Sequence, residues 1–577
     1  MDNRQFDAAK SQRAAIETDH IEAFASGKMS RRDFVRRGTI IGLSVPLMSA
    51  VIAACSSDAK STATTAAAGA TTTAAPGVTT TVADSTTSAA PAGAIKQGGV
   101  LRIAAQKPAA PLDPVKMADL GTYSPVVTAF EYLVNFTDGK LAPMLAESWK
   151  PNKDGSVWTF TLRKGVKWHD GTAFSSADVV ATMDRLAGSN LKSYITAGSA
   201  KAIDGSTVEI TLKNADGQFP HQVGPYNPQS VITPADFVAG TTLDKRMTGT
   251  GAFKMTKFDP AVGATFVANT EWWGGKPYLD GIEFLFSDDI QTQISGIQGG
   301  AADAILQFPV IGSEALLNDS NLTVESIHGS GHRQLSMNTR EGNFKDVRVR
   351  QAIALGLDRD AIIKTVLAGK GDIGNDHPIS PIFPFFDSSL PQRKRDIAKA
   401  KQLLKDAGKE GFSPTLFFPK LLEIPQLAEV IQSQLKEIGM NVTLKQEVEV
   451  DGVEWCKVYD SKVEPAGCDG GEEFTLVDYG PRAVPDVYLL KAYATGEWNS
   501  AHFISEPFRA AVKEYQAALD LDGQKKAIAT LQKIANDEVP YVIPYFYNSL
   551  TAYTKKVTGI VATGLGHYYC GKAGFLA

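Results

Sequence analysis

Residues 158–180 read Trp-Thr-Phe-Thr-Leu-Arg-Lys-Gly-Val-Lys-Trp-His-Asp-Gly-Thr-Ala-Phe-Ser-Ser-Ala-Asp-Val-Val. Apolar and polar residues alternate from Trp158 to Leu162, which predicts a strand with one buried face. The Lys-Gly and Asp-Gly pairs that follow are typical of turns, and Ser175 or Ser176 is suited to cap a helix. His169 lies between these elements, and we expect it to satisfy local hydrogen bonds rather than to take part in catalysis.

Five further motifs flank this stretch, one after another along the chain. They are residues 98–104 (Gly-Gly-Val-Leu-Arg-Ile-Ala), 112–114 (Leu-Asp-Pro), 141–149 (Leu-Ala-Pro-Met-Leu-Ala-Glu-Ser-Trp), 249–253 (Gly-Thr-Gly-Ala-Phe) and 346–353 (Asp-Val-Arg-Val-Arg-Gln-Ala-Ile). With residues 158–180 they resemble the signature of the family 5 extracellular solute-binding proteins. That family includes the oligopeptide-, dipeptide- and nickel-binding receptors of ABC importers. The resemblance covers most of the chain after residue 96.

The resemblance implies an α/β protein with the type II periplasmic-binding-protein fold, in which two lobes meet at a hinge and an extra subdomain marks cluster C. The implied division is residues 96–137, 246–336 and 545–577 for lobe I, residues 138–245 for subdomain II and residues 337–544 for lobe III. Ligand binding is then expected to close the lobes around the hinge.

Local signals place several helices. The stretch around residues 123–133 is expected to be helical, and after Arg333 the pattern becomes regularly α/β. Asp346 and Asp358 are predicted N-caps of two helices. A third helix is predicted over residues 396–407 and a fourth over residues 426–438, ended by Gly408 and Gly439 respectively.

The composition is that of an ordinary globular protein. The chain has 577 residues, 43% of them hydrophobic and 21% charged, which is enough for two or more domains with sizeable cores. Lys and Arg number 58 against 63 Asp and Glu, a net charge of -5. This balance gives no basic field for nucleic acid and no basis for broad adhesion to a membrane surface.

We interpret residues 1–55 as a signal peptide. Arg31 and Arg32 lie in a segment that resembles a twin-arginine export motif, although a Sec signal with paired arginines remains an alternative. The apolar run that follows is too short for a convincing membrane span. It ends Ile-Ala-Ala-Cys, which resembles a bacterial lipobox and predicts a lipid on Cys55. Whether translation starts at Met1 or at Met29 stays open.

Residues 56–95 are rich in Ala, Thr and Ser and have almost no large apolar side chain. Such a segment cannot bury enough surface to offset the entropy of ordering it, so we expect a disordered tether. The tether would join an acylated Cys55 to the rest of the chain. The expected location is the extracytoplasmic face of the bacterial cell membrane.

The sequence offers little for catalysis. It has no Gly-x-Ser-x-Gly, no phosphate-cradling loop and no His-Glu-x-x-His. Outside the cell, Cys456 and Cys468 could form a disulfide that closes a short loop, which leaves Cys570 as the odd thiol. A metal site is the rival interpretation, but the nearby histidines show no ligand spacing with these cysteines. We therefore expect no enzymatic activity, no cofactor and no metal.

The binding signal we favour lies in residues 474–486. Peptide-binding members of the family resembled carry Trp-x-x-Asp-Tyr-x-Asp-Pro here, and their first Asp holds the α-ammonium of the ligand. Asp478 and Tyr479 match that pair, but Thr475 stands in the Trp position and Asp486 comes several residues late. A carboxylate in a dry cleft suits a cation because it is a charged acceptor. A different register would favour Asp486 over Asp478.

Other residues of this chain are softer candidates for ligand contacts. Tyr123, Tyr226 and Asn227 lie on segments where members of the family often touch ligand. Arg340 could meet a carboxylate with two parallel hydrogen bonds. Two glutamates just before residue 474 add negative charge, which favours a cationic or amine-bearing ligand.

These observations favour a monomeric substrate-binding lipoprotein of an ABC importer. It would capture a peptide or peptide-like solute and deliver it to permease and ATPase subunits. A secreted peptide hydrolase is an alternative, but it needs a nucleophile–base pair or a metal. A ligand-sensing subunit of a signalling system is another. The sequence does not distinguish among an oligopeptide, a dipeptide, an opine, a sugar and a metal chelate.

Overall fold

The computed structural model describes residues 94–577, apart from residues 110, 118, 138–139, 239, 448–472, 483 and 495–497. The predictions for Arg31, Arg32, Cys55, Cys456 and Cys468 lie outside the described residues, as does nearly all of the expected tether. No helix in the described part of the chain is long and apolar enough to cross a membrane.

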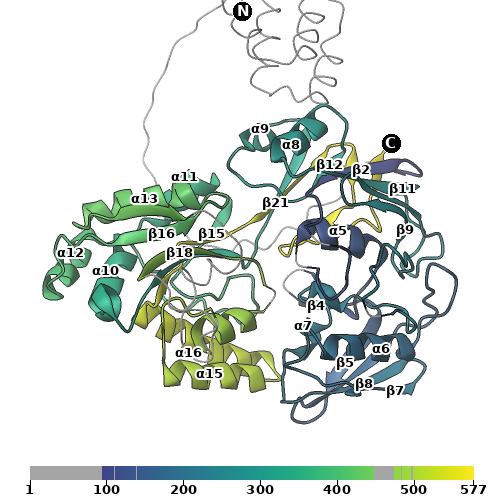
Figure 1. The fold of residues 1–577 in the computed structure, drawn as a ribbon, viewed down its shortest axis with the longest axis horizontal. Coiled ribbons are helices and arrows are strands. Elements are labelled where there is room, and N and C mark those ends of the chain that lie inside the picture. Colours follow the sequence, from purple (N-terminus) through teal and green to yellow (C-terminus); the bar gives the residue numbers. More distant parts are fainter. Residues whose placement is uncertain are drawn as a thin grey trace, which may run out of the picture.

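Three bodies, each with its own sheet, make up the structure (Figure 1). We use the names lobe I, subdomain II and lobe III for the bodies that these sheets define. In Figure 1 lobe III lies at the left, with lobe I above subdomain II at the right.

Lobe I is built on a seven-stranded sheet in the order β13-β21-β12-β2-β11-β10-β9. The central β2 pairs in parallel with β11 and β12, and its buried residues join the main apolar core. The strands are β2 (Val100–Ala105), β9 (Phe253–Asp259), β10 (Gly263–Ala268), β11 (Gly281–Phe286), β12 (Ala304–Ile305), β13 (Leu322–Ile327) and β21 (Ser549–Thr554). The helices are α5 (Leu120–Ala129), α8 (Ile290–Gln298) and α9 (Glu314–Leu317).

Short strands near the two ends of the described chain belong to the same body. A three-stranded sheet joins β1 (Ile95–Lys96), β25 (Gly574–Leu576) and β22 (Val557–Thr558). A two-stranded ribbon joins β23 (Val561–Ala562) and β24 (Tyr568–Tyr569). The first and last described segments therefore lie side by side.

Subdomain II contains residues 158–180, and the strand and the helix cap predicted there are confirmed. Trp158 and Phe160 are buried, and the Ser175 side chain forms a capping box with Asp178 at the start of the following helix. The four-stranded sheet and the elements packed beside it are β5 (Ala146–Pro151), β6 (Val157–Leu162), β8 (Thr207–Thr211), β7 (Ala200–Asp204), α6 (Ser176–Ala187), α7 (Phe219–Gln222), η1 (Pro228–Ser230) and the hairpin β3 (Val134–Thr137) and β4 (Lys140–Pro143).

Lobe III is built on a mixed sheet in the order β15-β20-β14-β18-β16-β17, with β19 also paired to β14. Its strands are β14 (His332–Met337), β15 (Gly371–Ile373), β16 (Thr415–Pro419), β17 (Thr443–Glu447), β18 (Phe474–Tyr479), β19 (Tyr541–Val542) and β20 (Tyr545–Tyr547). Its helical segments are η2 (Gly342–Lys345), α10 (Val347–Gly356), α11 (Arg359–Leu367), α12 (Ile397–Asp406), α13 (Ile424–Glu437), the π-helical η3 (Tyr488–Ala494), α15 (Glu506–Ala517) and α16 (Leu521–Glu538).

The N-caps predicted at Asp346 and Asp358 are confirmed, while Asp396, predicted as the first residue of a helix, is instead the N-cap of α12. The side chains of Asp346, Asp358 and Asp396 each accept a hydrogen bond from a backbone N–H in the first turn of the next helix. Gly408 and Gly439 follow helix ends with φ angles of 65° and 94°, a region that glycine enters without steric cost.

One predicted helix is displaced. The helix expected over residues 123–133 is α5, which begins at Leu120 and ends at Ala129. The helix ends at Ala129 because backbone carbonyl groups from this point on accept hydrogen bonds from residues outside the helix. The Ala129 carbonyl accepts a hydrogen bond from Gly251 N–H (2.9 Å), and the Glu131 carbonyl accepts one from Ile232 N–H (2.9 Å). The long-range partners compete with the helix for its carbonyl groups.

The chain passes between lobe I and lobe III at two adjacent crossings. Residues 328–331 link β13 to β14, and Asn548 links β20 to β21. Because β13 pairs with β21 and β14 with β20, both antiparallel, the crossings run side by side. Tyr547 N–H donates to the Gly331 carbonyl (2.9 Å) within this pair. Figure 1 shows β21 leading from the sheet of lobe I towards lobe III.

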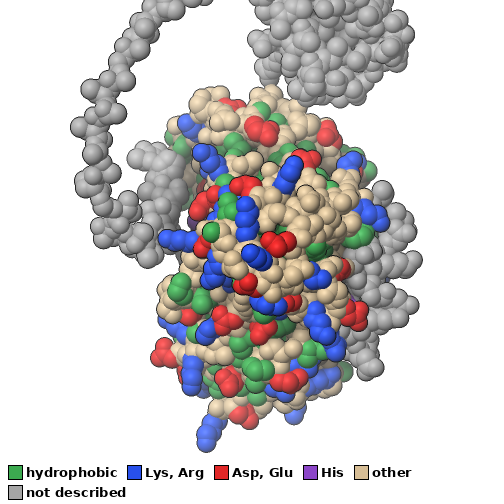
Figure 2. All heavy atoms as spheres, turned by 90° about the vertical axis from the view of Figure 1, so that its left-hand side faces the viewer, with side chains coloured by type: hydrophobic (Ala, Val, Ile, Leu, Met, Phe, Trp, Pro, Cys, Tyr) green, Lys and Arg blue, Asp and Glu red, His purple; other side chains and the backbone are tan. Residues whose placement is uncertain are grey.

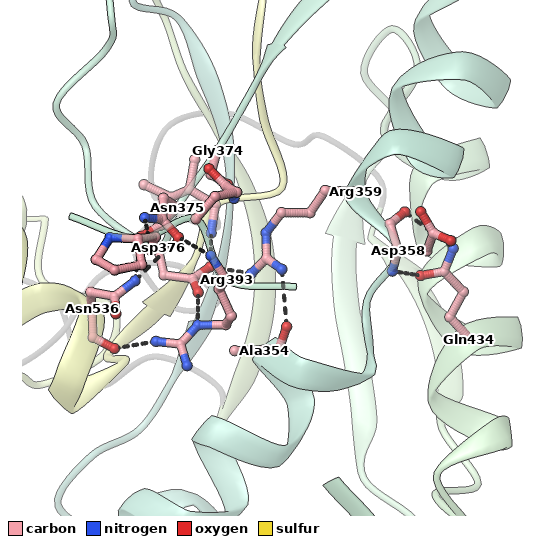
Figure 3. Close-up of polar contacts among 12 residues, drawn as sticks. Ala354, Asp358, Arg359, Gly374, Asn375, Asp376, Arg393, Gln434 and Asn536 are labelled. Atoms are coloured by element: carbon pink, nitrogen blue, oxygen red, sulfur yellow. Dashed lines mark hydrogen bonds and ion pairs between the residues drawn. The ribbon is translucent and has the colours of Figure 1, made fainter. Parts of the chain in front are cut away.

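A buried polar cluster fixes one long loop inside lobe III (Figure 3). Asp376 has no exposed surface, and its φ of 63° is left-handed, which is uncommon for a residue other than glycine. Its carboxylate accepts from Arg359 Nη2 (2.6 Å) and from Arg393 Nε (2.7 Å). Arg393 also donates to the carbonyl of Asn536 in α16. Both carboxylate oxygens are therefore occupied by protein groups.

The outer face of lobe III carries mixed charge. In Figure 2 Lys and Arg side chains alternate with Asp and Glu over the face at the left of Figure 1, and no large area of one sign stands out. This face agrees with the nearly balanced composition of the whole chain.

Candidate functional site

Three parallel strands of lobe III end at one edge of its sheet. β16 runs parallel to both β17 and β18, so Pro419, Glu447 and Tyr479 lie at the same edge. Tyr479 pairs with His332, the first residue after the crossing from lobe I. This edge therefore faces the junction of the two lobes. Ligands of open α/β sheets bind outside the carboxyl ends of the strands.

A buried arginine joins two carboxylates at this edge. Arg333 forms ion pairs with Asp478 and, at 2.8 Å from Nε to Oε1, with Glu423 directly before α13. Its guanidinium lies over the ring of Tyr547, 4.4 Å from the ring centre. Tyr547 Oη donates to Asp478 Oδ1 (3.3 Å), and Tyr545 Oη donates to Glu423 Oε1 (3.0 Å). The two strands beside β14 therefore both contribute to the Arg333 cluster, β18 through Asp478 and β20 through two tyrosines.

This cluster has a surplus negative charge and one open oxygen. Two carboxylates face one guanidinium, and the Arg333 side chain is only 1% exposed while that of Asp478 is 28% exposed. Arg333 and Tyr547 both use Asp478 Oδ1, and Oδ2 accepts no hydrogen bond from any described residue. Asp478 therefore lies in a strand with a buried partner, and its second oxygen is placed to accept a cation.

Tyr479 has a packing role. Its ring stacks on His332 at 5.4 Å with an angle of 5° between the planes, and its hydroxyl donates to the Trp498 carbonyl (3.0 Å). Tyr488 packs edge-on against the same imidazole at 4.9 Å. Burial lowers the pKa of His332 to about 4, so this imidazole is neutral at pH 7.

Arg482 is a residue that sequence reasoning missed. Its N–H donates to Ser330 Oγ (2.7 Å) at the crossing between the lobes, and that hydroxyl donates back to the Arg482 carbonyl. No ion pair joins its guanidinium to a carboxylate among the described residues, and its one recorded side-chain hydrogen bond is to the Pro481 carbonyl at 3.5 Å. The only feature of the sequence that could have pointed to Arg482 is its positive charge four positions after Asp478.

Arg482 reaches across the junction towards Tyr123 of lobe I. Burial raises the pKa of Tyr123 to about 12, and the Arg482 charge opposes that rise. The Tyr123 ring stacks on His567 at 5.4 Å. The structure thus brings Tyr123 to the same junction as Asp478, with Arg482 between the two lobes.

Leu422 supplies apolar surface at the carboxyl edge of β16. Its side chain is 55% exposed, and its φ of 46° is left-handed. Such a backbone is costly for leucine, and exposed apolar residues in strained backbone are candidates for ligand contacts.

Tyr226 and Asn227 lie in subdomain II. Asn227 is buried and donates to the Gln222 carbonyl (3.2 Å), so its side chain is engaged locally. The Tyr226 ring packs edge-on against Phe136 at 5.2 Å. The Tyr226 hydroxyl is buried and has no hydrogen-bond partner in the described part of the chain.

Asp486 is in a different environment from Asp478. It is 2% exposed, and Tyr515 Oη lies 3.4 Å from its Oδ2. Burial, and next the charge of Asp216, raise the pKa of Asp486 to about 8. Asp478 and Asp486 are therefore not alternatives for one position, because they lie in separate polar clusters.

Arg340 lies apart from the other candidates. It follows the end of β14 that is opposite the lobe junction, and β14 alone spans roughly 17 Å. There Arg340 is exposed and lines a surface cavity of 530 Å³ beside Lys345 and Arg350. The structure does not bring Arg340 to Asp478.

His169 is held by hydrogen bonds within the structure, as predicted, but its partners are 80 and 82 residues away along the chain rather than local. Its Nε2 is 3.0 Å from the Gly251 carbonyl, and its Nδ1 accepts from Gly249 N–H (3.2 Å). Burial lowers its pKa to about 4. Within the described residues no group of three or more His, Cys, Asp or Glu side chains could hold a metal ion.

Comparison with known proteins identifies the family. The family model described as bacterial extracellular solute-binding proteins, family 5 Middle, matches residues 140–490, which is more than half of the chain. The chain belongs to this family. The resemblance stated from the sequence motifs is thereby confirmed, and with it the solute-binding class of the protein.

Curated family 5 relatives align over most of their length. The dipeptide-binding protein of Escherichia coli (strain K12) is 26% identical over 485 residues, which cover 77% of this chain and 88% of the relative. Heme-binding protein A of Haemophilus influenzae is 26% identical over 477 residues, covering 76% of this chain and 85% of the relative.

Solved family 5 structures share the fold. The periplasmic binding protein DppA from Helicobacter pylori, in complex with the peptide STSA, gives a TM-score of 0.66 at 24% identity and covers 84% of this chain and 99% of its own. HbpA2 from Haemophilus parasuis gives 0.72 at 22% identity and covers 83% and 100%. The type II periplasmic-binding-protein fold expected from the sequence is therefore confirmed.

Proposed function

We propose that this chain is the substrate-binding lipoprotein of an ABC importer and captures a peptide-like, amine-bearing solute between lobe I and lobe III. The observation that supports this most directly is the open Oδ2 of Asp478, in a cluster with one surplus negative charge at the lobe junction. The names of several relatives support this proposal, because they describe proteins that bind dipeptides, di- and tripeptides or glutathione.

In this proposal Asp478 accepts hydrogen bonds from the ammonium group of the solute, and Arg482 donates hydrogen bonds to an acidic group. Arg482 comes four positions after Asp478, so their Cα atoms are at most about 14 Å apart. A short molecule with an ammonium and a carboxylate near its ends could span them. Tyr123 closes the site from lobe I, and Leu422 offers contact to an apolar side chain of the solute.

Ligand capture is proposed to close the lobes about the paired crossings at residues 328–331 and Asn548. Few residues link the bodies there, which suits a hinge. We further propose delivery of the solute to permease and ATPase subunits of an importer. Export by Arg31 and Arg32, a lipid on Cys55 and a disulfide between Cys456 and Cys468 remain proposals from the sequence.

Ligand recovery tests the proposed function. The protein is purified from its native cells without refolding, denatured, and the released small molecules are identified by mass spectrometry. We expect an unmodified, amine-bearing solute that rebinds the refolded protein in a calorimetric titration. Recovery of cleaved fragments after long incubation would favour the peptide-hydrolase alternative, and a recovered solute with no amine would contradict the assignment of Asp478.

A further inference from the structure

Subdomain II and lobe III touch far from the hinge. Gly217 N–H, in the loop before α7, donates to the Gln516 carbonyl in α15 (3.0 Å). A Cβ atom added to Gly155 would lie 2.7 Å from Leu519 Cδ2, so the two surfaces are in close contact there. Figure 1 shows the end of α15 reaching the lower part of subdomain II.

Two buried aspartates lie at this contact, one from each body: Asp216 directly precedes Gly217, and Asp486 is bound by Tyr515, which directly precedes Gln516. Asp216 is 5% exposed and Asp486 is 2% exposed. Asp216 Oδ1 accepts from Gln218 N–H (2.7 Å), and Tyr515 Oη reaches Asp486 Oδ2 (3.4 Å). Asp486 Oδ1 is buried and has no hydrogen-bond partner among the described residues. One of the four carboxyl oxygens thus has an unmet bonding capacity inside the contact.

Among the described residues, the titratable groups around this pair carry no positive charge at neutral pH. Subdomain II contributes Tyr194, His221 and Tyr226, while lobe III contributes Tyr488 and Tyr515. Burial lowers the pKa of His221 to about 4 and raises the pKa of each of these tyrosines above its usual value. No ion pair in the described part of the chain joins Asp216 or Asp486 to Lys or Arg. A metal would need further ligands, and the described residues offer no group of three or more.

We propose that Asp216 and Asp486 form a proton-dependent latch that holds subdomain II against lobe III. Protonation of one of the two carboxyl groups removes the repulsion between two buried negative charges. The inference rests on the lobe closure proposed above, because opening at the hinge would separate the two aspartates and expose them to water.

The pKa shifts set the direction of the pH effect. Burial and the neighbouring Asp216 raise the pKa of Asp486 to about 8, and burial raises that of Asp216 to about 6, from an ordinary 3.8. In the open form both values return towards 3.8, so closure takes up protons between those limits. Closure is favoured at the acidic end of this window and weakens as the pH rises through about 6 and then about 8.

The test measures lobe closure without ligand. Small-angle X-ray scattering of the full chain is recorded from pH 5 to pH 9. We expect the radius of gyration of the natural protein to be smaller at pH 5, with the equilibrium constant for closure falling up to about tenfold per pH unit for each proton involved. Asp486→Asn replaces the protonated acid by a neutral amide of the same shape, so this variant should stay closed at pH 9.

Asp154→Asn is the matched control, because Asp154 lies in the same subdomain but is fully exposed and its pKa is lowered by Ser156. This variant should keep the pH dependence of the natural protein. A natural protein whose size does not change with pH would overturn the latch, as would an Asp486→Asn protein that opens at pH 9 like the natural one. Because no ligand is used, a failure of solute binding alone leaves this result intact and counts only against the proposed function.

Discussion

Asp486 comes eight positions after Asp478, and the environments of the two aspartates suit different roles. Asp478 has a guanidinium partner and a second oxygen that accepts no hydrogen bond from the described residues, while Asp486 is buried near another carboxyl group and has no ion-pair partner among those residues. A charged carboxylate in a partly open cluster suits an ammonium ligand, whereas a buried carboxyl pair suits a shared proton.

The Asp478→Asn variant tests the ammonium site. It keeps the side-chain shape and removes the charge. Breaking a buried ion pair from one side costs about 3–5 kcal/mol, so solute binding should weaken by roughly a hundredfold or more. The ligand-free protein should also lose stability, because Arg333 loses one of its two carboxylate partners.

Calorimetric titration at pH 6 with the recovered solute measures this effect. Asp486→Asn is the control, because the Asp486 carboxyl is protonated at that pH and its amide is a neutral replacement. If Asp486→Asn weakens solute binding more than Asp478→Asn does, then Asp486 and not Asp478 is the aspartate that binds the ammonium group. If neither change weakens binding, the solute is not an amine held at Asp478.

Arg482 is tested by a graded pair of substitutions. Arg482→Gln should weaken binding of a solute with a free carboxylate by about tenfold to a hundredfold, since a charged hydrogen bond is worth about 1.5–3 kcal/mol. Arg482→Lys should recover part of the loss, because it keeps the charge without the planar fork. The same solute with its carboxylate amidated should bind the natural protein and Arg482→Gln equally.

Arg340→Gln is the control for this series, since Arg340 lies at the far end of β14 and should not affect affinity. The assignment of Arg482 fails if the amidated solute binds the natural protein as tightly as the free acid.

At the scale of single elements, lobe III depends on both local caps and a long-range buried cluster. A capping aspartate satisfies one or two N–H groups of its own helix. Asp376 instead connects α11, the loop that carries Arg393 and the backbone before β20. The Asp376 cluster should contribute more to stability than a helix cap does, because its loss leaves buried arginine side chains without a carboxylate partner.

Asp376→Asn should lower the free energy of unfolding of lobe III by about 3–5 kcal/mol, because two arginine side chains lose their shared carboxylate. Asp358→Ala removes only the N-cap of α11 and should cost about 0.5–2 kcal/mol. Urea denaturation followed by tryptophan fluorescence measures both. Equal losses for the two variants would show that the Asp376 cluster is no more than a local contact.

At the scale of the whole molecule, the three bodies and the paired crossings fit a protein that closes on a solute at the outside of a membrane. No helix among the described residues is long and apolar enough to cross a membrane. The attachment proposed from the sequence is a lipid at Cys55.

Cys55→Ala should release the protein from the membrane without changing its affinity for the solute, because the site lies in residues far along the chain from Cys55. Membrane fractionation after expression in a bacterial host measures release, and Cys570→Ala is a control that keeps the lipidation site. A Cys55→Ala protein that stays in the membrane fraction would falsify the lipid anchor.

The sequence alone determined the features that depend on neighbours along the chain. The order of the six motifs was enough for the family, and the helix starts after Asp346 and Asp358 were predicted because a cap and its N–H partners lie within three residues. A structural role for His169 was also predicted from its position between a strand and a turn, but its distant partners Gly249 and Gly251 were not.

Only the tertiary structure decided the partners that lie far apart in sequence. Arg333 and Asp478 are 145 residues apart, and Asp216 and Asp486 come from different bodies, so no local pattern could pair them. The α5 helix ends earlier than predicted for the same reason, because the Ala129 carbonyl accepts a hydrogen bond from Gly251, which is 122 residues further along the chain. Whether a carboxylate is open, paired or protonated depends on burial and on the charges around it, and folding alone brings those together.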